Sequence, residues 1–136
     1  MIFLMVAKFV FVMVLFHTIN VNGLRDPLKR LSFCHWLSGL KSDAVCLQEL
    51  HCVSEDEVRS WFLSFSVVSS VGSNKSCGVA VLFRTSFTLV DVDRDSLGRF
   101  VRAQLLRAGS ISDVVSLYAP NLRSDWFYSF QLCFPS

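Results

Sequence analysis

The chain has 136 residues, of which 52% are hydrophobic and 18% charged, and this composition excludes an intrinsically disordered protein. The length suits a single domain that is large enough to bury a core. The formal net charge of +2 is too small to indicate a nucleic-acid partner by itself, although a local basic patch would be enough for one.

The five cysteines form no Cys-x-x-Cys pair and show no zinc-ligand spacing. An odd number, with Cys46 inside an apolar run, is typical of reduced thiols in an intracellular protein. We therefore expect no disulfide framework and interpret the cysteines as small core residues.

Residues 1–16 are apolar except for Lys8, and they allow two interpretations. The β-branched and aromatic run from Phe9 to Phe16 is typical of a buried strand. A signal peptide or membrane anchor is the alternative, although a helix of this length spans about 24 Å, less than the roughly 30 Å of a bilayer core. Lys8 would also lie in mid-span, where charge is disfavoured. The sequence favours the strand and leaves the alternative open.

A helix is predicted after this segment. Asn20 and Asn22 lie between the apolar segment and this helix, and in an extended chain their side chains share one face. Asp26 is then placed as an N-cap, with Pro27 in the first turn. Apolar residues at i, i+3, i+4 and i+7 predict one buried stripe on this helix, formed by Phe33, Trp36, Leu37 and Leu40.

The stretch from Ala44 to His51 is an apolar run that ends in an amide, a carboxylate and an imidazole. Its apolar residues fit a strand buried on both faces, and Gln48 and Glu49 are expected to emerge where that strand ends. Because a helix connects this strand with the preceding one, the two are predicted to be parallel neighbours. Their carboxyl ends would bring Asn20 and Glu49 to one edge, where α/β folds keep their ligands and chemistry.

The remainder of the chain predicts one short helix and then a series of strands. The helix begins with the capping box Ser54-Glu55-Asp56-Glu57. Asp91, Asp93 and Asp95 are interpreted as turn residues. Short strands joined by tight turns predict an antiparallel meander over residues 65–71, 78–83, 87–92, 99–106 and 113–118.

Four motifs occur in order along the chain: Thr18-Ile19-Asn20-Val21-Asn22-Gly23-Leu24, Leu47-Gln48-Glu49, Gly78-Val79-Ala80-Val81-Leu82 and Leu117-Tyr118-Ala119-Pro120-Asn121. Together they resemble the endonuclease/exonuclease/phosphatase superfamily, and most of all exonuclease III-type AP endonucleases and the endonuclease domains of LINE-type retrotransposons. The resemblance implies an α/β (α+β) fold, a four-layered sandwich of the DNase I-like type that is truncated to roughly its first half. Residues 1–136 would then be a single incomplete domain.

The resemblance also implies a set of catalytic residues. Glu49 matches the magnesium-binding glutamate, and Asn20 matches the asparagine that hydrogen-bonds within the metal and phosphate site. Tyr118 matches the tyrosine that contacts the scissile phosphate, and Asn121 the asparagine that supports it. Glu49 and Asn20 are thus the expected metal residues, for Mg²⁺ with Mn²⁺ as an alternative.

By the same resemblance, the expected partner is the phosphate backbone of DNA. Asn22 falls where some relatives carry an aspartate, and it is a candidate nucleic-acid-binding residue. Arg25 and Lys29 follow shortly after the Asn20 motif, where they could meet backbone phosphates. A solvated helix face is the alternative interpretation of these two basic residues.

Two departures from the family pattern predict a fragment that is inactive alone. Leu50 stands where these nucleases usually have a small hydroxyl residue, and its bulk could disturb the groups around the metal ligand. The family's Gly-Asp-x-Asn and Ser-Asp-His motifs, which orient the attacking water and pair the base, have no counterpart in the chain. The sequence therefore predicts a fragment of a magnesium-dependent phosphodiesterase resembling DNA endonucleases, intracellular and nuclear.

Two alternatives to this function stay open. One is the phospholipid or inositol-phosphate phosphatase branch of the same superfamily, which the apolar N-terminal run would suit. The other is a non-enzymatic domain that is secreted or membrane-tethered because residues 1–16 act as a signal or anchor. Intact disulfides would support the second alternative.

Overall fold

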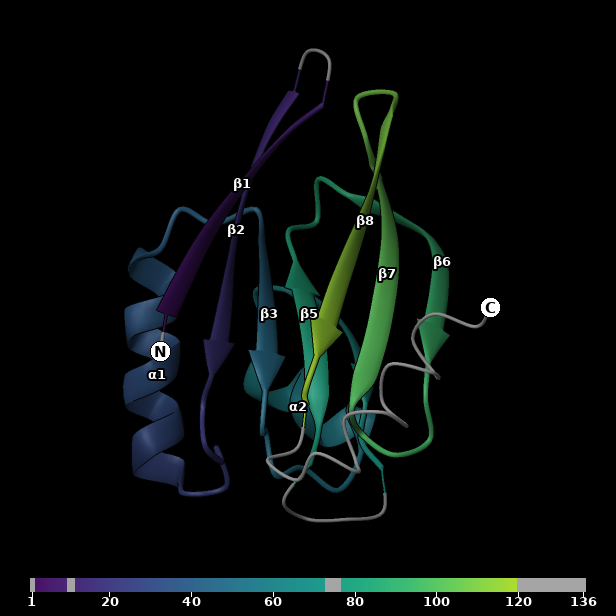
Figure 1. Ribbon diagram of the computed structural model, residues 1–136. Coiled ribbons are helices and arrows are strands. Elements are labelled where there is room, and N and C mark those ends of the chain that lie inside the picture. The colour runs from purple at the N-terminus through teal and green to yellow at the C-terminus, as the bar shows by residue number, and fades with distance from the viewer. Residues whose placement is uncertain (1, 10–11, 73–76, 120–136) are drawn as a thin grey trace.

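The computed structural model describes residues 2–9, 12–72 and 77–119, which form two β-sheets and two helices (Figure 1). The helices are α1 (Pro27–Gly39) and α2 (Glu55–Trp61). The first sheet has the strand order β1-β2-β3-β5-β4, and the second has the order β6-β7-β8. The strands are β1 (Ile2–Phe9), β2 (Val12–Asn20), β3 (Ala44–Gln48), β4 (Ser66–Ser70), β5 (Val79–Phe83), β6 (Thr88–Arg94), β7 (Phe100–Arg107) and β8 (Ser110–Leu117).

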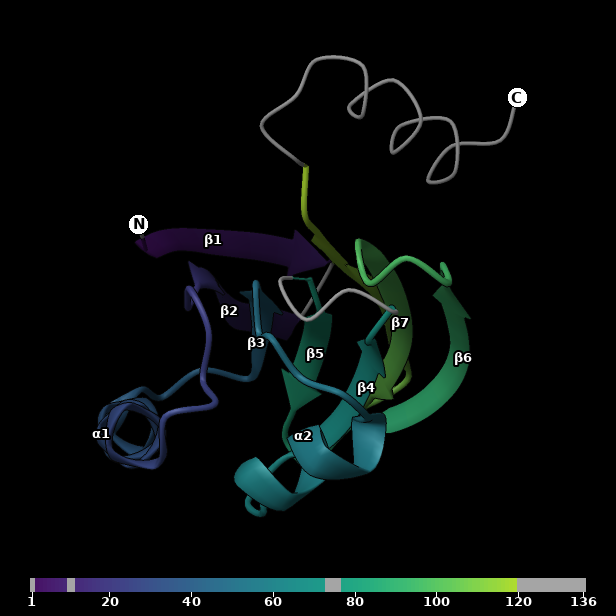
Figure 2. The same cartoon turned by 90° about the horizontal axis from the view of Figure 1, so that it is seen from below.

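The two sheets pack face to face, and both helices lie on the opposite face of the first sheet (Figure 2). One core fills the space between the helices and the first sheet and includes Leu37, Leu47 and Val58. A second core lies between the sheets and includes Val81 and Val101. The described residues thus build three layers of the expected sandwich, and within them no helix covers the outer face of the second sheet.

The apolar N-terminal segment contains two strands rather than the single strand expected over residues 9–16. β1 and β2 are antiparallel, and Phe9 pairs with Val12 at the end of their ladder. A continuous apolar run has no alternation that would mark a turn, so the pattern could not divide it. Within the described residues, no helix has the length and hydropathy needed to span a membrane.

The predicted antiparallel pairing is correct for β4 with β5 and for β6, β7 and β8. The single continuous meander is wrong, because β4 and β5 belong to the first sheet and β6 opens the second. Every residue of β3 and β5 is buried, because one face meets the helical core and the other meets the second sheet. In β8, by contrast, buried and exposed residues alternate, since only one face is covered. A strand buried on both faces carries no period that assigns it to a sheet.

Helix α1 begins as predicted, but its apolar stripe is only partly covered. Asp26 is the N-cap, its carboxylate accepts the N–H of Leu28 at 3.0 Å, and Pro27 opens the helix. Leu37 is buried, whereas Trp36 is 40% exposed. The helix lies over the β2 side of the first sheet (Figure 2), and part of its aromatic surface remains open to solvent.

Helix α2 begins with the predicted capping box, and one of its acidic residues also binds two strands. Ser54 Oγ accepts the N–H of Glu57 at 3.1 Å. Glu55 Oε2 accepts both the N–H and the hydroxyl of Ser69 at 2.9 Å. The same oxygen pairs with Arg94 Nη1 at 2.7 Å. Glu55 therefore ties α2 to β4 and β6, beyond any interaction with the helix dipole.

We expect Glu55 to contribute stability that is lost in acid. Burial alone would raise the pKa of its carboxyl, but the hydrogen bonds from Ser69 and the charges of Arg94 and Arg59 hold the pKa below its ordinary value. A carboxyl with a lowered folded-state pKa stabilises the fold above its ordinary pKa of about 4.3. That contribution disappears as the pH falls through the folded-state pKa.

The Glu55→Gln variant should therefore show a flatter acid limb in a profile of thermal midpoint against pH, measured between about pH 7 and pH 2. Asp56→Asn is the matched control, because the Asp56 side chain is 94% exposed on the same helix. The thermal midpoint of this variant should depend on pH in acid as that of the wild type does. Identical acid limbs in wild type and Glu55→Gln would contradict the prediction.

Gln48 is buried rather than emerging at the end of β3, so that expectation is wrong. Its Nε2 donates to Thr18 Oγ1 at 2.9 Å and to Ser116 Oγ at 3.0 Å. A buried amide requires such partners, and here they come from β2 and β8. Gln48 thus links the two sheets beside the edge where β2 and β3 end.

Asp91 and Asp93 lie on β6 rather than in the predicted turn. Both pair with Arg102 on the neighbouring strand, and the Arg102 Nη2 to Asp91 Oδ2 distance is 2.8 Å. Asp95 alone lies in the turn, where its carboxylate accepts the N–H of Arg99 at 3.1 Å. The alternating aspartates mark a solvent-facing strand whose charge is compensated by Arg102.

Candidate functional site

The carboxyl ends of β2 and β3 meet at one edge of the first sheet. The two strands are parallel, and Asn20 pairs with Gln48. Glu49 is the next residue, and its Oε1 accepts a hydrogen bond from Asn20 Nδ2 at 3.0 Å. Asn20 Oδ1 in turn accepts the N–H of Asn22 at 3.0 Å. The predicted meeting of Asn20 and Glu49 is therefore present, and Asn20 orients the carboxylate.

The backbone at this edge is left-handed at three residues that carry side chains. The φ angle is 47° at Asn22, 55° at Glu49 and 57° at His51. Asparagine and histidine adopt such angles more readily than other non-glycine residues, whereas at Glu49 the angle costs on the order of 1 kcal/mol. A main-chain hydrogen bond of 2.6 Å from Gly23 N to Glu49 O joins the two loops. A strained backbone at Glu49, next to the Asn20 hydrogen bond, is typical of a functional site.

His51 belongs to this edge, and the sequence did not identify it. Its Nε2 lies 4.0 Å from Glu49 Oε2. The ring also covers the backbone of Gly23, where an added Cβ would come within 2.5 Å of His51 Nδ1. His51 is not part of a Ser-Asp-His motif, which has no counterpart in the chain. The only signal for His51 was its position two residues after Glu49.

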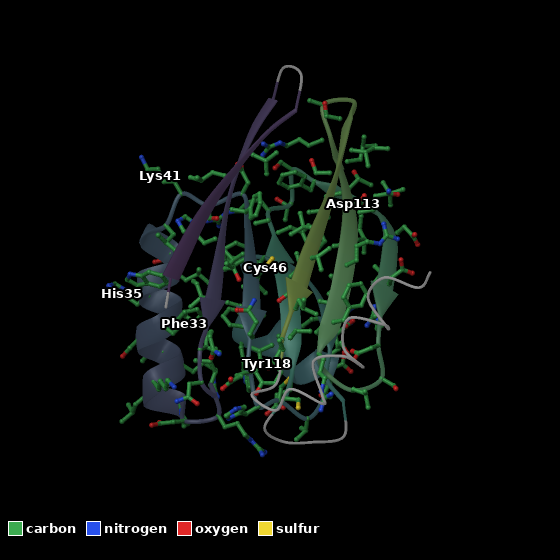
Figure 3. All side chains as sticks on the ribbon, viewed as in Figure 1. Phe33, His35, Lys41, Cys46, Asp113 and Tyr118 are labelled. Carbon is green, nitrogen blue, oxygen red and sulfur yellow. The ribbon has the colours of Figure 1, made fainter. Side chains whose placement is uncertain are left out.

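Tyr118 follows β8 directly, at the end of the sandwich where β3 also ends (Figure 3). Burial raises the pKa of its phenol, as do the negative charge of Glu49 and a hydrogen bond with that carboxylate. The charge of Arg99 acts in the opposite direction. The phenol therefore keeps its proton at neutral pH and is a hydrogen-bond donor beside Glu49.

Arg99 is a second residue of this region that the sequence did not identify. Its carbonyl accepts the N–H of Tyr118 at 2.8 Å, which fixes the two residues side by side. Its Nε is buried and has no hydrogen-bond partner among residues 2–9, 12–72 and 77–119. A buried guanidinium N–H requires an acceptor, and an anion is the strongest one. The Arg99 guanidinium thus adds positive charge close to Tyr118.

The predicted nucleic-acid-binding residues surround the loop that follows β2. Lys29 Nζ donates to the carbonyl oxygens of Val21 and Asn22, both at 2.8 Å, and so fixes that loop. Arg25 is exposed on the same loop. Asn121, the remaining catalytic candidate, lies outside the described residues.

Leu50 does not disturb the site, because its side chain is fully buried in the core beneath the helices. The Glu49 carboxylate has lone pairs beyond the one that Asn20 uses. Mg²⁺ binds through one or two carboxylates and keeps several waters, so this single carboxylate fits it. In the described part of the chain, no three His, Cys, Asp or Glu side chains gather in a way that could hold a metal ion.

The chain is similar to known proteins over most of its length. The model of the Endonuclease/Exonuclease/phosphatase family matches residues 17–132. The Transposon TX1 uncharacterized 149 kDa protein of Xenopus laevis is 30% identical over 107 residues, which are 76% of this chain and 8% of that protein.

Three solved structures show the same fold over part of their length. The Xenopus laevis APE2 catalytic domain is 18% identical with a TM-score of 0.65, and the match covers 86% of this chain and 52% of that one. An AP endonuclease from Archaeoglobus fulgidus is 27% identical with a TM-score of 0.60, covering 85% and 46%. TDP2 from Caenorhabditis elegans is 18% identical with a TM-score of 0.59, covering 82% and 36%.

The chain thus spans about half of the first two of these structures and a small part of the transposon protein. The two-sheet fold and the order of the sequence motifs agree with the family match. This chain belongs to the Endonuclease/Exonuclease/phosphatase family.

Proposed function

We propose that this chain supplies one side of the catalytic site of a metal-dependent phosphodiesterase that acts on DNA. The observation that carries the proposal is the Asn20–Glu49 hydrogen bond at the strained edge of the first sheet, with the Tyr118 phenol beside the same carboxylate. A carboxylate held in this way is an oriented ligand for a hard cation. The family relationship supports phosphodiester chemistry in general.

Glu49 would hold Mg²⁺, or Mn²⁺ in its place, and Asn20 would keep the carboxylate in position. When bound, the cation neutralises the charge that develops on the phosphate and lowers the pKa of a bound water. Tyr118 would turn its hydroxyl away from Glu49, which would then hold the cation, and donate a hydrogen bond to a non-bridging phosphate oxygen. The positive charge of Arg99, which acts on Tyr118, would favour a phosphate beside it.

The DNA substrate is supported by the comparisons with AP endonucleases and a transposon protein. Arg25 is exposed beside the site, where it could meet a backbone phosphate. Asn22 and Lys29 would stabilise the loop that carries Arg25, and Lys29 would keep one N–H donor for a phosphate. A nuclear location would accompany this substrate.

We expect the purified chain to bind Mg²⁺ weakly through Glu49 and to cleave DNA at no detectable rate. The Asn20–Glu49 side of the site is present, whereas the sequence carries no Gly-Asp-x-Asn or Ser-Asp-His motif to orient water and pair a base. Isothermal titration calorimetry measures the binding of Mg²⁺, and a cleavage assay on a labelled DNA duplex measures the turnover.

Glu49→Ala should abolish the Mg²⁺ binding, and Asp56→Ala, at an exposed carboxylate outside the site, should preserve it. Unchanged Mg²⁺ binding in Glu49→Ala would overturn the proposed metal site. Turnover by the wild-type chain above that of Glu49→Ala would show that the chain is catalytically complete.

A further inference from the structure

A cavity of about 250 Å³ lies beside Asn20, between α1 and the end of β2. Its walls are formed by Ile19, Val21, Phe33 and Trp36, and the polar side chains on its lining are those of Asn20 and Lys29. The proposed phosphodiester chemistry does not use this cavity. Typical ligand pockets measure roughly 300–1,000 Å³, so this one has room for a single ring system rather than a whole nucleotide.

The walls of the cavity are suited to a flat aromatic ligand. Phe33 and Trp36 lie one turn apart on α1, with ring centroids 5.8 Å apart and planes tilted by 36°. Phe33 lies on the side of the helix that faces β2, opposite His35 (Figure 3). Trp36 is 40% exposed, so an incoming ring would meet indole surface that the fold leaves uncovered.

The polar rim connects the cavity to the phosphodiester site. Asn20 lines the cavity and also donates to Glu49, so the two sites share one residue. Lys29 Nζ is fixed by two carbonyl oxygens at 2.8 Å. An ammonium group has three N–H donors, and one of them remains for an anion. A cation therefore lies on the rim of the aromatic cavity, and Asn20 connects that rim to the Glu49 carboxylate.

We propose that this cavity binds one unstacked base of the nucleic-acid strand whose phosphate lies at the Glu49 site, with Lys29 contacting a phosphate between them. The inference rests on the proposed function and adds to it a preference for DNA with an unpaired base next to the bound phosphate. Stacking on an aromatic side chain is the common way in which proteins hold an unpaired base. A nucleobase matches the size of the cavity, its apolar walls and its cationic rim.

The test is equilibrium binding of the full chain, in Mg²⁺, to fluorescently labelled duplexes that are fully paired or contain a single unpaired base. The wild-type chain should bind the duplex with the unpaired base on the order of tenfold more tightly.

Trp36→Ala should remove this preference while leaving affinity for the paired duplex unchanged. Trp36→Phe should retain most of it. Leu28→Ala, at a residue on α1 that is 76% exposed and outside the cavity, is the matched control and should behave as wild type.

The outcomes separate this inference from the proposed function. Equal affinity of the wild-type chain for both duplexes would overturn the base cavity and leave the phosphodiester site standing. An equal loss of affinity for both duplexes in Trp36→Ala, with an unchanged thermal midpoint, would also overturn it. Failure of the wild-type chain to bind either duplex would overturn the proposed DNA substrate, and the cavity assignment with it.

Discussion

A chain that begins at His17 is expected to lose cooperative unfolding, whereas a chain that begins at Val12 should keep it. Val12 opens β2, which lies between β1 and β3 in the first sheet. Removing residues 12–16 deletes Val14 from the core between the sheets. It also deletes Leu15, whose N–H donates to Asp43 Oδ2 at 2.8 Å and whose carbonyl accepts the Asp43 N–H at 2.7 Å.

The expected loss is large compared with the stability of a domain. A fully buried aliphatic side chain contributes about 1.5–3 kcal/mol, and typical domains are stable by only about 5–15 kcal/mol. The truncated chain would also lose Phe16, which pairs with Ala44 at the start of β3. Urea unfolding followed by far-ultraviolet circular dichroism compares the two truncations. One sharp, reversible transition in the chain that begins at His17 would show that residues 1–16 are dispensable for the fold.

Gly98→Ala should be among the most destabilising single substitutions in the chain, by about 2–5 kcal/mol. Gly98 has a φ of 73°, and a Cβ there would lie 2.5 Å from Val71 O and 3.1 Å from Cys77 Cβ. A left-handed non-glycine residue costs roughly 1–2 kcal/mol, and overpacking against backbone adds about 1–3 kcal/mol. The substitution would also shift Arg99, the next residue, and with it the position of Tyr118.

Gly109→Ala isolates the backbone contribution, because Gly109 has a φ of 77° but no atom within 4 Å of an added Cβ. It should cost only the conformational part, about 1–2 kcal/mol. The free energy of unfolding of both variants, from urea titration at one temperature, measures the difference. Equal losses at the two positions would contradict the close approach of Gly98 to Val71.

The elements that could be predicted from sequence are those specified by short-range chemistry. Asp26 and Ser54 cap their helices because a side-chain oxygen meets a backbone N–H two or three residues later. The meeting of Asn20 and Glu49 follows from two apolar strands joined by a helix, which makes the strands parallel. These inferences need no knowledge of distant contacts.

The features that could not be predicted depend on which face of a strand is covered. Gln48 appeared to leave the core because its partners, Thr18 and Ser116, lie 30 and 68 residues away along the chain. Arg99 and His51 reach the site only through the packing of the two sheets and the left-handed loop. A left-handed φ at Glu49 has no local signal either, since glycine is the residue that usually adopts it.

The contacts of Glu55 and Arg94 with Ser69 have a consequence for how the first sheet could grow. β4 is an edge strand, and its outward N–H at Ser69 is bound by Glu55 while the carbonyl of Ser69 accepts from Arg94 Nη1 at 2.9 Å. These side chains occupy the positions that a neighbouring strand would use, and both are charged, which disfavours replacement by another backbone. Recruitment of a further strand, from another molecule or in an amyloid-like assembly, is therefore disfavoured at Ser69 of β4, and β1 is the other edge strand of this sheet among the described residues.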